Sequence, residues 1–289
     1  MSRGDRREEI FRDNLDRKSF LQALGATCEK TGWQVHAYCL MGNHFHLVIE
    51  TPRANLVEGM KWLLGTYTMR FNRRHKLSGH LFAGRYKSLL VDAATPGYLR
   101  AVCDYAHLNP ERAGLLRKRE RLQKYPWSSY PSYLRERRKR ERWLRCDRLL
   151  GEHGLMKDSR GTRLEFARRM EQRRTEPNDP SAQAIRRGWS FGAQDFIARL
   201  LDRMPGSVSE HHHARERSET DEQRAEAIIL ARLKKLGWRK TDLGTRRKSD
   251  PKKVALARVL RSQTTMSLKW IARRLEMGSW THVSNLLRQ

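Results

Sequence analysis

The chain has 289 residues, and because domains usually contain about 100–200 residues, at least two domains are expected. Lysine and arginine outnumber aspartate and glutamate 60 to 32, and the net charge of +28 predicts a polyanionic partner, most simply a nucleic acid. No apolar run approaches the roughly 20 residues of a membrane-spanning helix and no signal-peptide pattern opens the chain, so we expect a soluble, cytoplasmic, nucleoid-associated protein without a membrane partner.

The first elements along the chain are a helix and a hairpin. Apolar residues recur at helical spacing over residues 15–31, and Gly32 stands where that helix would end. Two strand-like runs follow at residues 33–40 and 44–50, separated by the Gly/Asn turn of residues 41–43. The pattern therefore predicts a helix followed by two antiparallel strands.

A second helix, a strand and a third helix come next. Asn55 caps an amphipathic stretch that ends in basic residues at 73–76, as helix C-termini prefer. Residues 86–91 predict a strand, and residues 98–109 predict a helix that Pro110 ends. This order is that of an α+β ferredoxin-like sandwich, an antiparallel sheet with helices on one face, whose first strand is truncated.

Beyond residue 130 the chain becomes strongly basic. Residues 135–142 are mostly arginine and lysine on an expected helix, and such a run is either a solvated helix face or a direct phosphate contact. Short helical patterns continue to about residue 201. The polar residues 205–219, which include three adjacent histidines at 211–213, predict a linker.

The last unit, residues 221–289, is predicted to be all-helical. Pro251 begins one helix, Ser267 caps another at 268–275, and Gly278 precedes a short polar helix at 280–288. A helix, a glycine turn and a short polar helix are typical of a helix-turn-helix, although a plain helical bundle has the same pattern. The basic context favours DNA contact.

The cysteines do not indicate a metal or disulfide framework. Their four positions lie far apart in the chain and form no C-x-x-C pair: Cys28, Cys39, Cys103 and Cys146. This spacing argues against a zinc ribbon and against disulfide bonding. We expect reduced residues that mostly serve packing.

A histidine pair and a tyrosine carry the predicted chemistry. Alternate residues of a strand point to the same face, so His44 and His46 project side by side. Alone, such a pair is weak evidence, because strands also tolerate surface histidines. On the following helix, Tyr105 and Asn109 are four residues apart and share one face. Asn109 would add an oxygen ligand to a metal held by both histidines, a set that suits Mg²⁺ or Mn²⁺.

Tyr105 would then lie beside that metal as a nucleophile. A phenol, with a pKa of about 10, is a poor nucleophile at neutral pH unless positive charge stabilises its phenolate. A divalent ion meets this need and also polarises a bound phosphate oxygen. Attack on DNA phosphorus leaves a phosphotyrosine, which a freed hydroxyl can reverse or redirect without ATP. The alternative is structural, with Tyr105 packed on the sheet and Asn109 forming the helix end.

Two blocks resemble the signature segments of the HUH single-tyrosine, IS200-like transposases, in particular the REP-associated tyrosine transposases. They are residues 41–50, MGNHFHLVIE, and residues 104–115, DYAHLNPERAGL. Further similar segments are residues 71–75, 79–88 and 127–130, so the likeness covers residues 2 to about 130 closely and 143–203 more loosely. Residues 253–289 are similar to the helix-turn-helix of the replication initiator DnaA.

The resemblance implies a ferredoxin-like catalytic domain with a divalent cation at His44, His46 and Asn109. It implies that Tyr105 attacks single-stranded DNA at folded palindromic repeats and leaves a 5′-phosphotyrosine and a free 3′-hydroxyl. Family members begin with a strand just before the segment that matches residues 2–4, so the first strand of the sheet is expected to be truncated in this chain. The residues predicted to contact DNA are Arg73, Arg74, Arg85, Lys87 and Arg112, with Thr281, His282, Ser284, Asn285 and Arg288 in the last unit.

The sequence thus predicts a catalytic domain at 1–130, a basic helical extension at 131–204, a linker at 205–220 and a DnaA-like domain at 221–289. The predicted function is a metal-dependent endonuclease and strand transferase for single-stranded and hairpin DNA, monomeric or homodimeric, with duplex DNA bound by the last domain. One alternative is a non-catalytic DNA-binding or regulatory protein on the same scaffold. Another is an RNA-binding sheet, which lacks support because no aromatic RNP pattern is present.

Overall fold

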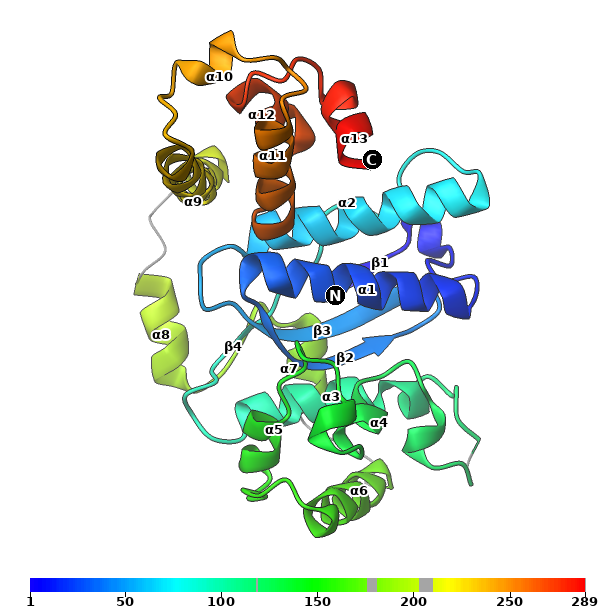
Figure 1. The fold of residues 1–289 in the computed structure, drawn as a ribbon. Helices are drawn as coiled ribbons and strands as arrows, with labels where there is room; N and C mark the ends of the chain where they lie inside the picture. The colour runs from blue at the N-terminus through cyan, green and yellow to red at the C-terminus, as the bar shows by residue number, and fades with distance from the viewer. Residues whose placement is uncertain (118, 176–180, 203–209, 289) are drawn as a thin grey trace. The chain divides into compact units, whose positions relative to one another are not determined.

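The computed structural model describes residues 1–117, 119–175, 181–202 and 210–288, with side chains in the last range described from residue 222 onward (Figure 1). The chain is α+β and forms two compact units. One unit comprises Met1–Cys28, Trp33–Glu50 and Leu64–Gly206. The other comprises Glu29–Gly32, Thr51–Leu63 and Ser207–Gln289.

An antiparallel sheet with the strand order β1-β3-β2 forms the centre of the first unit. β2 (Gln34–Leu40) and β3 (His44–Glu50) make the expected hairpin, in which Leu40 faces Phe45. β1 (Ser2–Arg3) pairs with the opposite edge of β3 and is two residues long. The first strand is therefore short, as expected.

The strand expected at residues 86–91 is wrong as a member of this sheet. Only Leu90–Val91 forms a strand, β4, and it pairs in parallel with β5 (Ser190–Phe191). Residues 81–87 instead follow the outer edge of β1: Met1 and Lys87 exchange backbone N–H···O bonds of 2.9 and 2.8 Å. Because β1 offers two residues to pair with, this contact does not extend into a regular strand.

Helices cover both faces of the sheet, so the expectation of helices on one face is wrong. α1 (Asn14–Thr31) and α2 (Leu56–His75) lie on one face, and α3 (Tyr98–Arg112) lies on the other (Figure 1). Phe45 of β3 points to the first face, where its ring centre is 4.7 Å from that of Phe20 on α1. The neighbouring strand positions point to the second face and are covered by α3.

α3 runs through Pro110 to Arg112, so the expectation that Pro110 ends this helix is also wrong. The proline lies in the last turn, where its missing N–H removes one hydrogen bond from a helix that is already ending. Ala113 then donates its backbone N–H to the Asn109 carbonyl at 2.9 Å.

The basic extension packs within the first unit. Its helices are α4 (Tyr130–Tyr133), α5 (Asp147–Glu152), α6 (Arg160–Arg174), α7 (Ser181–Arg187) and α8 (Gln194–Asp202). The helix expected at residues 135–142 is wrong, because only Arg137–Lys139 forms a single 3-10 turn there. Arg140 folds back instead and donates to the carbonyls of Ser132 and Arg135, which lie at and beyond the end of α4.

The second unit contains five helices in the described part of its C-terminal segment: α9 (Glu210–Leu236), α10 (Asp242–Thr245), α11 (Pro251–Gln263), α12 (Leu268–Arg274) and α13 (Trp280–Arg288). Of the expected linker at 205–220, residues 205–209 lie outside the described residues, and from Glu210 the chain is helical. Ser267 caps α12 as expected, its hydroxyl accepting from the Trp270 N–H at 3.2 Å. Leu260, Ile271 and Val283 are fully buried in the core.

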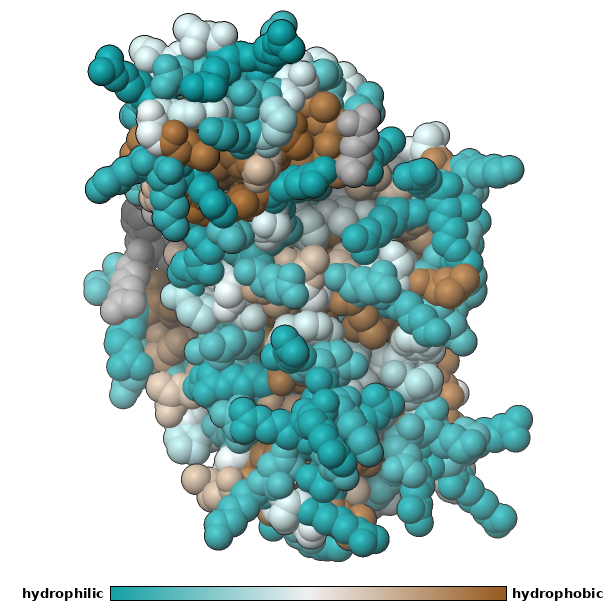
Figure 2. Space-filling view, viewed as in Figure 1, coloured by the Kyte–Doolittle hydropathy of each residue, from teal (hydrophilic) through white to brown (hydrophobic). Residues whose placement is uncertain are grey.

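Surface and composition agree. The face seen in Figure 2 carries mostly hydrophilic side chains, as expected for a chain with 32% charged residues.

The four cysteines are free and buried, which confirms the packing role. Within the described residues, none of the helices combines the length and hydrophobicity needed to cross a membrane.

Candidate active site

The two histidines of β3 lie side by side on the face covered by α3. The ring centres of His44 and His46 are 5.1 Å apart, with an interplanar angle of 75°. His44 Nδ1 is 2.7 Å from the Asn43 side-chain oxygen, which orients the ring and leaves Nε2 for another partner. The strand geometry thus allows one nitrogen from each ring to approach a common point.

Both imidazoles are neutral at neutral pH. Burial, with the charges of Arg3 and the N-terminus, lowers the pKa of His44 to about 4. Burial also lowers the pKa of His46 to about 3, with smaller contributions from His44 and nearby cations that include Arg186. A neutral imidazole is the form that binds a metal.

Tyr105 on α3 reaches the same place. Its ring centre is 5.9 Å from that of His46. The Arg112 guanidinium carbon lies 4.8 Å from the centre of the Tyr105 ring. Arg186 of α7 donates from Nε to the Tyr105 hydroxyl oxygen at 3.1 Å. The phenol therefore lies beside the His46 imidazole and two guanidinium groups.

Asn109 lies one helical turn beyond Tyr105 and is buried. Its amide nitrogen donates to the Tyr105 carbonyl at 3.1 Å, so the oxygen is the end of the amide that suits a metal. Within the described residues, no group of three His, Cys, Asp or Glu side chains forms a metal site. Two neutral imidazoles and one amide oxygen remain a donor set that fits a divalent cation with open positions.

Buried polar contacts hold α3 against the sheet. His107 Nε2 is 2.8 Å from the Ser129 hydroxyl, which also accepts from the Tyr38 N–H of β2 at 2.9 Å. Burial lowers the pKa of His107 to about 4, so this ring is neutral as well. The backbone of residues 127–129 bonds along the outer edge of β2. The resemblance of residues 127–130 to a family segment thus has a structural basis.

A buried carboxylate directly precedes the tyrosine. Asp104 is fully buried, and its carboxylate binds two side chains of the extension. One carboxylate oxygen is 3.0 Å from His153 Nε2, and the other accepts a hydrogen bond from Arg173 of α6. Sequence reasoning missed this group. The only local signal was an acid in an otherwise apolar stretch, because its partners lie 49 and 69 residues further along the chain.

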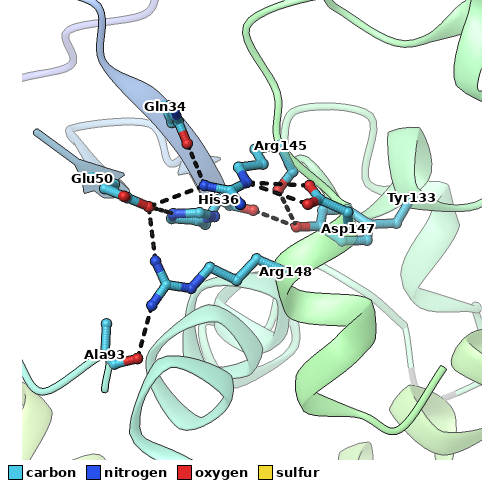
Figure 3. A network of polar contacts seen from close by, with 8 residues as sticks. All are labelled: Gln34, His36, Glu50, Ala93, Tyr133, Arg145, Asp147 and Arg148. Atoms are coloured by element: carbon cyan, nitrogen blue, oxygen red, sulfur yellow. Dashed lines mark hydrogen bonds and ion pairs between the residues drawn. The ribbon is translucent and has the colours of Figure 1, made fainter. Parts of the chain in front are cut away.

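A second network joins the far end of the hairpin to the extension (Figure 3). Glu50, the last residue of β3, binds His36 Nε2 at 3.2 Å, Arg145 at 3.4 Å and Arg148 at 2.8 Å. Arg148 also donates to the Ala93 carbonyl at 2.8 Å. Burial opposes ionisation of Glu50, but the hydrogen bond from His36 and the charge of Arg148 lower its pKa below the usual value. These contacts tie β2, β3 and α5 together.

The residues predicted to contact DNA are divided between the two units. Arg112 lies at Tyr105, whereas Arg74 is held by ion pairs to Asp13 and Asp16. Arg73, Arg85 and Lys87 are exposed on the first unit. The remaining five lie on α13 in the second unit, where Thr281, Asn285 and Arg288 are exposed and His282 and Ser284 are half-buried.

Fold and site together define a basic α+β protein in which a tyrosine packs against one of two neighbouring neutral histidines. Residues 1–107 match the model of the family described as Transposase IS200 like, which supports a DNA transposase with DNA as its partner. The matched region contains His44, His46 and Tyr105 and ends before Asn109 and the extension. None of the curated proteins and none of the solved structures compared matches the chain.

Proposed function

We propose that the protein is a metal-dependent endonuclease and strand transferase for single-stranded DNA, with Tyr105 as its nucleophile. The observation that carries the proposal is the contact of the Tyr105 phenol with His46 and Arg186 on a face of the sheet where His44 also lies. The match of residues 1–107 to the IS200-like transposases and the charge of +28 support it.

The proposed reaction exchanges one phosphodiester for another. The Tyr105 hydroxyl oxygen forms a bond to phosphorus, and the bond from phosphorus to the 3′-oxygen breaks. The phenolic proton passes to solvent water and the departing 3′-oxygen takes up a proton from solvent water, which leaves a 5′-phosphotyrosine and a free 3′-hydroxyl. Because the ester bond energy is retained, attack by another 3′-hydroxyl on the phosphotyrosine joins strands without a further energy source.

His44, His46 and the Asn109 amide oxygen are the residues that would hold Mg²⁺ or Mn²⁺. Such an ion, when bound, supplies positive charge that polarises a phosphate oxygen. The protein's own contribution is to present neutral imidazoles, to orient His44 through Asn43 and to fix Tyr105 through α3. The sheet with β1 beside β3 is compatible with the proposed ferredoxin-like, HUH-type domain.

The proposal is tested by covalent capture. Purified protein with Mg²⁺ and a single-stranded hairpin oligonucleotide is expected to form an adduct that survives denaturing electrophoresis, with the 5′ phosphate on a peptide containing Tyr105. Palindromic hairpins are the substrate class that the family resemblance indicates. A non-catalytic DNA-binding protein would retain the oligonucleotide in a native gel and yield no adduct.

The metal ligands are expected to differ in importance. At limiting Mn²⁺, His44→Ala and His46→Ala should each slow adduct formation by about 100-fold, because each variant removes an imidazole that would coordinate the ion directly. Asn109→Ala should cost about 10-fold and be largely rescued by excess metal, since water replaces a neutral oxygen ligand. Adduct rates over a Mn²⁺ titration measure both effects.

His80→Ala is the matched control, because His80 is an exposed imidazole of the same unit. It should leave the metal dependence unchanged. Equal activity of wild type and the His46→Ala variant at limiting metal would contradict the proposed ligand set.

We propose that the last three helices form a helix-turn-helix that binds duplex DNA. α12 and α13 are joined by a turn at Gly278, whose φ of +84° is a conformation that suits glycine. Thr281, Asn285 and Arg288 follow one another at i, i+4 and i+7 and are all exposed, so they form a single polar stripe. A hollow beside α12, lined by Arg246, Arg247, Lys248 and Arg273, adds positive charge in the same unit.

Substitutions on α13 in the full chain test this role. Asn285→Ala is expected to lower affinity for the preferred duplex about 10-fold and to relax its sequence preference, because an asparagine amide can pair with a base edge. Arg288→Ala should weaken all duplexes alike and reduce the salt dependence of binding. Selection from a random duplex library, followed by anisotropy titrations at several salt concentrations, measures both.

Lys235→Ala, which removes an exposed cation from α9, is the control and should not alter sequence preference. Salt-insensitive duplex binding by wild type, or unchanged selection by Asn285→Ala, would contradict the recognition role of α13.

A further inference from the structure

We propose that Arg186, on α7, is a second catalytic residue, which holds the Tyr105 hydroxyl oxygen and binds the phosphate that this oxygen attacks. The inference rests on the proposed function of Tyr105. It concerns a residue of the extension, outside the region matched by the transposase family model.

Arg186 lies closer to the hydroxyl oxygen of Tyr105 than to the centre of its ring. Its Nε donates to the Tyr105 oxygen at 3.1 Å, while its guanidinium carbon is 6.0 Å from the centre of the ring. Arg112 shows the opposite arrangement, with its guanidinium carbon 4.8 Å from the ring centre. Arg112 therefore covers the aromatic ring, and Arg186 is the cation at the reacting oxygen.

Within the part of the chain that the structure describes, Arg186 also has donors left for a phosphate. A guanidinium carries five N–H groups, and the contact with Tyr105 uses the one on Nε. The two terminal nitrogens provide a pair of parallel donors that matches two oxygens of a phosphate. Tyr105 is 5% exposed and Arg186 is exposed, so a DNA backbone that reaches the phenol oxygen meets the guanidinium beside it.

This arrangement serves the chemical step as well as binding. When the bond from the Tyr105 oxygen to phosphorus forms and the bond to the 3′-oxygen breaks, negative charge gathers on the two non-bridging oxygens. Donors already placed next to the attacking oxygen stabilise that charge without reorganising. The same guanidinium restrains the direction of the nucleophile, because its Nε–H engages one lone pair of the hydroxyl oxygen.

The chain after α7 is anchored to the chain before α3. β5 follows α7 within a few residues, and Leu90 of β4 donates its N–H to the Trp189 carbonyl at 3.0 Å. Asp92 donates its N–H to the Phe191 carbonyl at 2.9 Å. The ring of Phe191 meets that of Tyr98, the first residue of α3, with 5.0 Å between centres.

The packing at this anchor is close. A Cβ on Gly192 would lie 2.4 Å from the Cβ of Asp92, so only glycine allows the approach. The buried Asp92 carboxylate accepts from the Thr95 hydroxyl at 2.8 Å and from the Ala193 N–H at 3.4 Å. α7 and the tyrosine helix are thus held by the same segment, residues 90–98, which fixes Arg186 relative to Tyr105.

The test measures single-turnover adduct formation by the full chain at saturating hairpin oligonucleotide with Mg²⁺. Arg186→Ala is expected to reduce this rate by about 100-fold, the effect of removing one donor to a developing oxyanion. Arg186→Lys should recover part of the rate, because a single ammonium replaces the charge but not the paired donors. Addition of low millimolar guanidinium to Arg186→Ala should raise its rate, because the free cation can take the place of the missing side chain. A variant whose defect is only lost packing would not respond to guanidinium.

Arg187→Ala is the matched control, since it removes a neighbouring exposed cation from the same helix. It should lower affinity modestly, more at low salt than at high salt, and leave the saturated rate within about twofold. An Arg186→Ala rate equal to or above that of an active wild type would overturn the inference and leave the function of Tyr105 standing. A higher rate would mean that Arg186 inhibits the tyrosine. Failure of wild type to form any adduct would overturn both.

Discussion

Replacement of Tyr105 by phenylalanine is expected to abolish covalent attachment to DNA. The substitution removes one oxygen atom and keeps the ring that meets His46 and Arg112. Loss of an enzymatic nucleophile costs roughly 10⁴–10⁶-fold in rate, so adduct should fall below detection. Affinity for the uncleaved hairpin should stay within about threefold, because the phosphate contacts made by arginine and lysine are unchanged. Denaturing gels measure the adduct, and anisotropy measures the affinity.

Tyr98→Phe is the matched control. Tyr98 lies on the same helix and its ring packs on Phe191, so loss of its hydroxyl should leave the adduct rate nearly unchanged. Adduct formation by Tyr105→Phe at a measurable rate would show that another group attacks the DNA. Loss of adduct and of affinity together would instead indicate that the phenol oxygen is needed for the fold of the site.

The second large effect concerns stability. Arg173→Ala should lower the free energy of unfolding by about 3 kcal/mol, because it leaves the buried Asp104 carboxylate without its cation. The loss belongs at the lower end of the usual range for such pairs, since His153 remains 3.0 Å from the other carboxylate oxygen. Urea denaturation monitored by far-UV circular dichroism measures it. Adduct formation should fall as well, because Asp104 directly precedes Tyr105 on α3.

A surface ion pair on α6, the helix that carries Arg173, provides the comparison. Arg168 bonds Glu165, but 63% of its side chain is exposed, so Arg168→Ala should cost less than about 1 kcal/mol. Equal urea midpoints for the two variants would show that the Asp104 carboxylate does not depend on Arg173.

Local features of the sequence were sufficient for the regular elements of the catalytic face. Helical spacing of apolar residues predicted α1 and α2, and the Gly/Asn turn predicted the β2–β3 hairpin. Strand alternation placed His44 and His46 on one face, and helical periodicity placed Tyr105 and Asn109 together on α3. In the second unit, Pro251, Ser267 and Gly278 marked helix limits correctly. These features depend on interactions within a few residues, so they can be read from the chain.

Local patterns failed where distant segments compete for the same backbone. Residues 86–91 have strand-forming composition, yet their pairing was decided by a two-residue β1 and by β5, about 100 residues away. The arginines of 135–142 have helical propensity, but Arg140 bonds the carbonyls around the end of α4 and holds the segment as a turn. Pro110 was accommodated because α3 ends within its own last turn.

The sequence alone therefore determined which residues of the candidate site share a strand face or a helix face. The tertiary structure was needed to show that α3 covers the histidine face, that His153 and Arg173 bind the Asp104 carboxylate, and that Arg186 lies at the Tyr105 oxygen. A buried charge is stabilised by any suitable partner that lies close to it in space. The partners found here are 49 to 81 residues away in the chain, so packing brings them together and local periodicity does not predict them.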